Sequence, residues 1–287
     1  MSNDRLSLQI LNANRIGELD ILLSSLLSQT YKEWDLILLD ESDTPSIKHK
    51  HINDLIKRIR CEGHGVIYKH TEAINNIGQS RNNCYDIDLF KNELCVRIDD
   101  DSYCDVNYLK YLVTTYKHLS KKHNVGAVGG IVPVLGNPSI KKKIPKIFNE
   151  TIVDKEGNIL DMADDGGMDF NVKEGSNVMM PSHHLRSSFL FTRTAYESVK
   201  GHPVEYGFNG FREETDFTMK MLFAGFSLYT NVLAVCYHLR AGGGSRQKSQ
   251  QEYMNLVKIN DEHFRKKIKY WIQTKGNLFN LRNNDEK

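Results

Sequence analysis

The sequence predicts an α/β protein with a mixed, mostly parallel sheet flanked by helices. Short apolar runs alternate with stretches whose apolar residues recur at helical spacing, and some runs, such as Leu36–Leu39, are apolar at every position. Continuous runs of this kind are typical of strands that are covered on both faces. With 287 residues, 40% hydrophobic and 26% charged, the chain can form a large core, and a disordered chain is excluded.

The expected elements follow one another along the chain. A strand at 6–11 precedes a helix at 16–27, where isoleucine and leucine recur every three or four residues. Further strands are expected at 36–39, 66–68, 94–98, 128–134, 189–191 and 234–239. Further helices are expected at about 52–59, 108–113, 213–224 and 247–274. This alternation favours parallel strands joined by helices.

The segment 135–185 breaks the pattern. Lys141–Lys143, Pro145 and Gly166–Gly167 stand among polar residues with little periodicity. Long loops inside a compact domain are often functional, so we expect a lid or binding loop here. The alternative is a disordered surface insertion.

Composition and motifs exclude several classes of function. The formal net charge of +2 gives no general case for binding nucleic acid. No stretch approaches the roughly 20 apolar residues of a membrane span, and the polar start is no signal peptide, so we expect a cytoplasmic protein. The five scattered cysteines are expected to be free thiols. The chain has neither a dinucleotide-binding glycine loop nor a P-loop, and Asp99–Lys110 does not fit a calcium-binding EF-hand loop.

Carboxylates follow two of the expected strands. Asp40–Asp43 includes three acidic residues after the second strand, and Asp99–Asp101 follows the fourth. Ligands of open parallel sheets bind beyond the carboxyl ends of the strands. Residues two apart in an extended chain share a face, so Asp99 and Asp101 can converge on one ligand. The alternative is a solvated acidic turn.

Other polar residues have both a structural and a functional interpretation. Arg81 and Asn82 suit a helix surface. His238, at a strand end, is either a hydrogen-bonded structural histidine or a metal ligand. Gly242–Gly244 with Arg246 forms either a phosphate-binding loop or a flexible linker.

In their order along the chain, these pieces resemble the inverting glycosyltransferases of family 2, which have the GT-A fold. The resemblance covers about residues 5–246 and is weakest over 135–185. It rests on Asn14–Arg15 with Ser25–Tyr31, on Trp34–Ile37 with Asp40, on Asn76–Asn82, on Arg97–Asp101, on Arg212–Phe217 followed by Ala224–Phe226, and on Tyr237–Leu239.

The resemblance implies a site for a nucleoside-diphosphate sugar of the UDP or GDP type. Asp40 would accept a hydrogen bond from the nucleobase, Asp99 would face the ribose, and Arg81 would lie near the base or the diphosphate. The residues expected to bind the nucleotide sugar are Asn12, Asn14, Arg15, Asp40, Arg81, Asp99, Asp100 and Arg246.

The resemblance also implies a divalent cation, Mn²⁺ or Mg²⁺. Asp101 and His238, with Asp99, are the expected ligands. Carboxylate and imidazole groups suit these ions, and the imidazole favours Mn²⁺. The cation would stabilise the charge of the leaving diphosphate.

Three acidic residues near a helix start are the catalytic candidates. Acidic side chains at this position are favoured by the helix dipole alone. Alignment with the family motif assigns Glu214 as the general base, where the family usually has Asp, and leaves Glu213 to orient the acceptor or brace the loop. Asp216 is the third candidate, and it shares a helix face with Glu213 because the two are three residues apart.

These inferences predict one GT-A domain over 1–246, with a nucleotide-binding half at 1–134 and an acceptor half at 135–246. A helical tail at 247–287 follows. The predicted activity is a metal-dependent, inverting hexosyl transfer to the hydroxyl of a glycan or lipid-linked acceptor. The alternatives are a sugar-phosphate nucleotidyltransferase and a nucleotide-sugar binding module without catalysis.

The tail combines basic and aromatic residues, which suits peripheral contact with the inner face of a membrane near a lipid-linked acceptor. A helix packed on its own domain is the alternative. The residues concerned are Phe264, Lys266, Lys267, Lys269, Tyr270 and Trp271.

Overall fold

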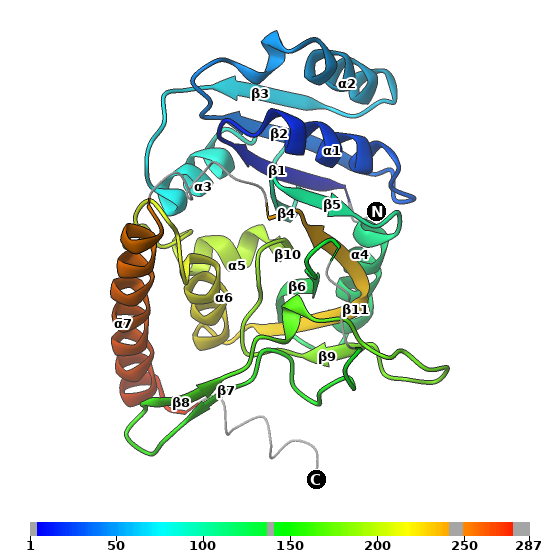
Figure 1. Ribbon diagram of the computed structural model, residues 1–287. Coiled ribbons are helices and arrows are strands. Elements are labelled where there is room, and N and C mark those ends of the chain that lie inside the picture. Colours follow the sequence, from blue (N-terminus) through cyan, green and yellow to red (C-terminus); the bar gives the residue numbers. More distant parts are fainter. Residues whose placement is uncertain (1–4, 137–140, 241–248, 278–287) are drawn as a thin grey trace.

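The computed structural model describes residues 5–136, 141–240 and 249–277. A mixed nine-stranded sheet forms its centre, and a separate two-stranded hairpin lies below it in Figure 1. The strands are β1 (Leu6–Asn12), β2 (Trp34–Asp40), β3 (Val66–His70), β4 (Leu94–Asp99), β5 (Ser102–Cys104), β6 (Val125–Ile131), β7 (Thr151–Val153), β8 (Ile159–Met162), β9 (Met179–Pro181), β10 (Phe189–Thr192) and β11 (Ser227–His238).

The sheet order is β3-β2-β1-β4-β10-β6-β11-β5, and β9 pairs with β11. The strands from β3 to β4 are parallel to one another, and so are β6 and β11. Strand β10 is antiparallel to both of its neighbours, and β5 and β9 are antiparallel to β11. The predicted mixed sheet is therefore confirmed.

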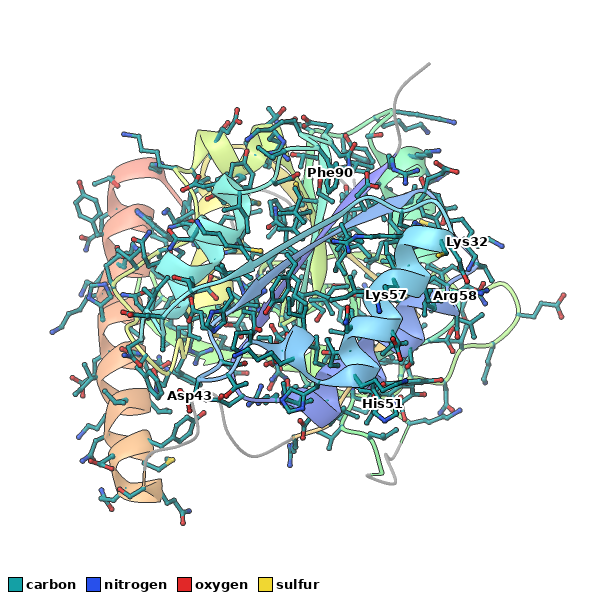
Figure 2. The ribbon with its side chains drawn as sticks, turned by 90° about the horizontal axis from the view of Figure 1, so that it is seen from above. Lys32, Asp43, His51, Lys57, Arg58 and Phe90 are labelled. Atoms are coloured by element: carbon teal, nitrogen blue, oxygen red, sulfur yellow. The ribbon has the colours of Figure 1, made fainter. Side chains whose placement is uncertain are left out.

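Helices cover both faces of the sheet. They are α1 (Ile16–Leu27), α2 (Lys50–Cys61), α3 (Ile77–Asp86), α4 (Tyr108–Leu119), α5 (Arg193–Ser198), α6 (Glu213–Phe223) and α7 (Gln250–Lys275), with 3₁₀ turns η1 (Ser46–Lys48) and η2 (Asp165–Gly167). Helices α1, α2 and α4 share one buried cluster, and α5, α6 and α7 share another. In Figure 2, α7 stands at one edge of the molecule, away from α2 with its labelled Lys57 and Arg58.

Alternation along the strands builds these two cores. In β1, Leu6, Leu8 and Ile10 belong to the cluster with α1, α2 and α4, whereas Leu11 belongs to a smaller cluster with Cys84 of α3. Each of these side chains is at most 8% exposed. This two-sided burial explains why the central strands are apolar at nearly every position.

The strand register aligns the polar ends of three strands. Asn12 pairs with Asp40 across β1 and β2, and Leu11 pairs with Asp99 across β1 and β4. The carboxylates at the ends of β2 and β4 therefore lie at the same edge of the sheet, as the sequence predicts. This edge carries the candidate site.

The segment 135–185 is largely irregular, as expected, but parts of it form short strands. Strands β7 and β8 form a hairpin, and β9 adds to the main sheet. Phe148 and Phe170 bury their rings in a cluster with Ile131 and Val232, which anchors the segment to β6 and β11. The strands are only three or four residues long, so they leave little periodicity in the sequence.

Helix α7 packs on its own domain, beside α6 and the β7–β8 hairpin (Figure 1). Phe264 is fully buried, and Lys267 pairs with Asp216 and Glu205. Neither side chain can face a membrane, which corrects the interfacial interpretation at these two positions. Among the described helices, none is long and apolar enough to cross a bilayer.

Candidate active site

A cavity of about 700 Å³ opens at the edge of the sheet where β1 and β4 end. Most of the expected site residues line it, namely Asn14, Arg15, Arg81, Asp99, Asp100, Asp101, Glu213, Glu214 and His238. Asn12, Asp40 and Asp216 are not among its lining residues. Arg246 lies outside the described residues, as do Gly242–Gly244.

Asp40 lies beneath the cavity and is fully buried. Its carboxylate accepts hydrogen bonds from Asn12 Nδ2 (2.9 Å), Ser46 N (2.6 Å) and Tyr68 Oη (2.7 Å). Burial acts to raise the pKa of Asp40, but hydrogen bonds from Ser42, Ser46 and Tyr68 lower it. The Asp40 carboxylate thus stabilises the loop after β2, and both of its oxygens accept hydrogen bonds from the protein itself.

The next residue, Glu41, does line the cavity. Its side chain is buried, and no described residue hydrogen-bonds to Oε1. Burial raises the pKa of Glu41, and the neighbouring Ser80 and Arg81 oppose this only in part. The sequence gives no separate signal for Glu41, because it stands beside Asp40 in the same acidic run after β2.

Asn12 and Asn14 tie the end of β1 to the loop after β2. Asn12 Nδ2 reaches Ser42 Oγ at 2.8 Å, and the backbone N–H of Asn14 donates to the same oxygen at 2.8 Å. Asn14 has a φ of 58°, a left-handed conformation that asparagine tolerates. Its side chain pairs with Asp43, which is labelled in Figure 2.

The Asp99 carboxylate lies between the guanidinium groups of Arg81 and Arg97. Its Oδ1 lies 2.6 Å from Nη2 of Arg81 and 3.7 Å from Nη2 of Arg97, and Ser187 Oγ donates to Oδ2. Burial acts to raise the pKa of Asp99, but the two guanidinium groups outweigh it and lower the pKa well below its usual range. Arg81 is only 4% exposed, so the alternative that it sits on a helix surface is wrong.

Arg15 pairs with the second and third carboxylates of the aspartate run. Its Nη1 lies 2.7 Å from Asp100 Oδ1 and 3.4 Å from Asp101 Oδ2. Burial raises the pKa of Asp100 to about 6, against the opposing effect of Arg15. Arg15 therefore supplies the positive charge that lets two adjacent carboxylates share this corner of the cavity.

Asp101 and His238 are the residues best placed to hold a divalent cation. Asp101 Oδ2 is buried and receives no hydrogen bond from the described residues, and His238 Nε2 lies 3.5 Å away. A buried carboxylate oxygen that accepts no hydrogen bond from the described residues, beside an imidazole nitrogen, fits Mn²⁺ or Mg²⁺, which take few protein ligands when substrate phosphates supply the rest. Both oxygens of Asp99 are already engaged.

The protein alone presents only part of a metal site. Within the described ranges there is no group of three or more His, Cys, Asp or Glu that could hold a metal ion. The backbone N–H of Arg240 donates to Nδ1 of His238 at 3.1 Å. This bond makes Nδ1 an acceptor and places the proton of the neutral ring on Nε2, so Nε2 can bind a metal only when the proton moves to Nδ1 and the bond from Arg240 is given up.

Glu213 and Glu214 are adjacent but lie in different surroundings. Arg97 Nη1 contacts both carboxylate oxygens of Glu213, at 3.1 and 2.9 Å, and His202 Nδ1 donates to Oε1 at 2.6 Å. Burial acts to raise the pKa of Glu213, but Arg97 and His202 lower it to about 2. Burial lowers the pKa of His202 to about 4, so its ring is neutral near pH 7.

Glu214 is half-buried and lines the cavity. No other residue in the described part of the chain forms a hydrogen bond or ion pair with its side chain. Burial raises its pKa, the charge of Glu213 raises it further, and Arg97 opposes both. Glu214 is thus a carboxylate with a raised pKa and open access to a ligand.

Asp216 is turned away from the cavity. Its Oδ2 accepts hydrogen bonds from Tyr206 Oη at 2.8 Å and from Lys267 Nζ at 2.6 Å. The side chain is fully buried. Asp216 therefore joins α6 to α7, and the structure does not bring it into the cavity with Glu213 and Glu214.

Sequence reasoning missed several other residues of the cavity. Arg97 could have been found from its spacing, since it lies two residues before Asp99 and thus on the same face of β4. The loop at 208–211 and Tyr253 of α7 also line the cavity. No sequence pattern marks these residues as part of the site, because only the tertiary fold brings α7 to the end of β4.

Comparisons with known proteins agree with this geometry. The family description "Glycosyl transferase family 2" matches residues 7–171. No curated protein sequence matches the chain. Similar folds include S. aureus TarS 1–349 in complex with UDP-GlcNAc, with 14% identity, a TM-score of 0.59, and coverage of 89% of this chain and 65% of that chain.

Two further solved structures are similar. GalNAc-T7 with UDP, GalNAc and Mn²⁺ has 15% identity and a TM-score of 0.62 over 89% of this chain and 48% of that one. The mannosyltransferase PcManGT from Pyrobaculum calidifontis, in complex with GDP-Man and Mn²⁺, has 14% identity and a TM-score of 0.53 over 84% and 58%. At these identities the likeness concerns the fold, and the chain spans less than two thirds of the length of each of these three structures.

The family match covers more than half of the sequence and includes both strand-end carboxylate clusters. The mixed sheet, with its cavity beyond the ends of β1 and β4, is that of the GT-A fold. The chain belongs to glycosyl transferase family 2.

Proposed function

We propose that the chain transfers a hexosyl group from a nucleoside-diphosphate sugar to an acceptor hydroxyl, with inversion at the anomeric carbon. The observation that carries the proposal is Glu214, an unpaired carboxylate with a raised pKa in the same cavity as Asp99 and Asp101. Family membership supports the reaction class. TarS in complex with UDP-GlcNAc and PcManGT in complex with GDP-Man, which have similar folds, support a UDP or GDP donor.

Glu214 acts as the general base in this proposal. A pKa above the usual glutamate value makes its carboxylate a stronger base. It removes the proton of the acceptor hydroxyl as that oxygen attacks the anomeric carbon. The bond from the anomeric carbon to the diphosphate oxygen breaks on the opposite face, and its electron pair leaves with the nucleoside diphosphate.

The nucleoside half of the donor lies against the end of β1 and the loop after β2. Glu41, whose Oε1 has no partner among the described residues, takes the role of nucleobase acceptor that we expected for Asp40. Asp99 still offers a second lone pair on each oxygen to the ribose hydroxyls. Arg81 and Arg97 mainly keep Asp99 and Glu213 ionised.

Asp101 Oδ2 and His238 would hold the divalent cation, and diphosphate oxygens and water would complete its shell. When bound, the cation supplies positive charge to the diphosphate as it leaves. Arg15, 3.4 Å from Asp101 Oδ2, orients that carboxylate. The acceptor is a glycan or a lipid-linked molecule, held on the Glu214 side of the cavity.

The test is turnover of UDP- and GDP-hexoses, with water or a glycan as acceptor, in the presence of Mn²⁺. We expect release of the nucleoside diphosphate and a product of inverted anomeric configuration, read by NMR. A retained configuration would contradict the role of Glu214. Formation of a nucleotide sugar from a sugar 1-phosphate and a nucleoside triphosphate would indicate the nucleotidyltransferase alternative, and binding without turnover would indicate a binding module.

A further inference from the structure

Arg212, the residue just before α6, has a left-handed backbone with φ 75° and ψ −1°. Residues other than glycine rarely adopt this conformation, because the Cβ atom crowds the following carbonyl oxygen. Such a conformation persists where surrounding contacts impose it. Glu213 and Glu214 follow directly, so the direction in which Glu214 points depends on the backbone of Arg212.

The contacts that hold Arg212 come from α7. Asp261 Oδ1 accepts hydrogen bonds from Arg212 Nε at 2.8 Å and Nη2 at 2.7 Å. The guanidinium carbon lies 5.3 Å from the ring centre of Phe264, one helical turn further along α7. Both members of the ion pair are largely buried, with side-chain exposures of 20% and 24%. Solvent therefore screens the pair only in part.

Helix α7 also fixes the loop before Arg212, through the residue next to Asp261. Asn260 Nδ2 donates to the backbone carbonyl of Tyr206 at 2.9 Å and to Oδ1 of Asn209 at 2.7 Å. Asn209 and its neighbours over 208–211 line the cavity. Figure 1 shows α7 lying beside α6. Helix α7 thus fixes the segment 206–212, which leads directly into Glu213 and Glu214.

We propose that Asp261 is a positioning residue, which aims Glu214 into the cavity by holding Arg212 in its left-handed conformation. The proposal rests on the proposed role of Glu214 as base. Asp261 itself is not among the lining residues of the cavity. It acts on the acceptor half of the reaction and leaves the donor contacts at β1 and β4 unchanged.

A double-mutant cycle tests the proposal, because glycine adopts the left-handed conformation without a clamp. Asp261→Ala should lower kcat by about 10- to 100-fold, with the donor KM within about threefold, as expected for a displaced catalytic group. In the background of Arg212→Gly, the same Asp261→Ala change should have little further effect. An Asp261→Ala effect of equal size in both backgrounds would overturn the proposal.

Arg265→Gln is the matched control. Arg265 makes an ion pair of similar length with the other oxygen of Asp261, at 2.7 Å, but does not contact Arg212. It should leave kcat near the wild-type value. An equal loss of kcat in Arg265→Gln would indicate general loosening of α7 and would contradict the specific role of Arg212.

Hydrogen exchange tests whether the Asp261–Arg212 ion pair, here called the clamp, holds the backbone before α6, and it needs no enzymatic activity. Asp261→Ala should increase amide exchange over 206–216, and exchange over β1 and β4 should stay unchanged. Unchanged exchange over 206–216 would refute the clamp even if transfer is observed. If the wild-type chain shows no turnover but this exchange rises, the clamp stands and the proposed function fails.

Discussion

Glu214→Gln should remove most of the transfer activity while leaving the fold intact. The side chain has no hydrogen-bond or ion-pair partner among the other described residues, so the amide leaves no buried group unsatisfied. Loss of a general base costs about 10²- to 10⁴-fold in rate, or about 3–5 kcal/mol of transition-state stabilisation. The donor contacts lie on other elements and should keep their affinity.

Glu213→Gln is the matched comparison, and the structure predicts the opposite profile. Its carboxylate is 1% exposed and balances Arg97 at 2.9 Å. Removing one partner of a buried ion pair costs about 3–5 kcal/mol, which corresponds to a fall in melting temperature on the order of 10 °C. We therefore assign Glu213 mainly to stabilising the start of α6. This is the second of its two expected roles, bracing the loop rather than orienting the acceptor.

The assay is donor turnover with saturating Mn²⁺ and sugar nucleotide, together with donor affinity by calorimetry and thermal melts of both variants. Glu214→Gln should lose kcat at unchanged melting temperature and donor affinity. Glu213→Gln should lose melting temperature first. If Glu213→Gln loses kcat at full stability while Glu214→Gln stays active, the assignment of the base is wrong by one residue.

Four further outcomes follow from the same geometry. EDTA should abolish turnover, Mn²⁺ should restore it, and Asp101→Ala should behave as the EDTA-treated protein; full activity in EDTA would contradict the cation site. Because the pKa of Glu214 is raised, the acidic limb of kcat/KM should lie above the ordinary glutamate value of 4.5, and a limb at or below it would argue against Glu214. The pKa of Glu213 is lowered to about 2, so the stability from its ion pair should be complete above pH 4.5 and lost as the pH falls toward 2; the melting temperatures of wild type and Glu213→Gln should therefore approach each other below pH 4.5 and converge only near pH 2. Glu41→Gln should weaken nucleoside diphosphate binding more than Asp40→Asn does once both are compared at equal folded fraction, and the reverse order would restore Asp40 as the base contact.

Much of the fold could be predicted because the central strands bury both faces. Strands such as β2 therefore appear in the sequence as continuous apolar runs, and α1 and α2 repeat their apolar residues at helical spacing. The short strands β7 and β9 could not be found in this way. Three residues give no period, and what holds them is pairing with segments distant in the sequence.

Site residues at the ends of strands could be predicted from the sequence. Residues whose orientation depends on tertiary packing could not. Asp99, Asp101 and His238 reach one cavity, as their positions after strands suggest. The sequence could not distinguish Asp40 from Glu41, because only the three-dimensional hydrogen bonds of the loop after β2 show which carboxylate is turned inward. For Asp216, the deciding partner Lys267 lies 51 residues further along the chain.

The pair Glu213–Glu214 shows how one helix start gives two carboxylates different tasks. Consecutive residues of a helix point about 100° apart, so one of them can face Arg97 on β4 while the other cannot. Arg97 places its positive charge against Glu213, which becomes a permanent anion with a pKa near 2. Burial raises the pKa of Glu214, that anion raises it further, and Arg97 offsets these effects only in part. Glu213 therefore does more than hold α6 in place, because its negative charge increases the basicity of Glu214, the carboxylate that faces the cavity.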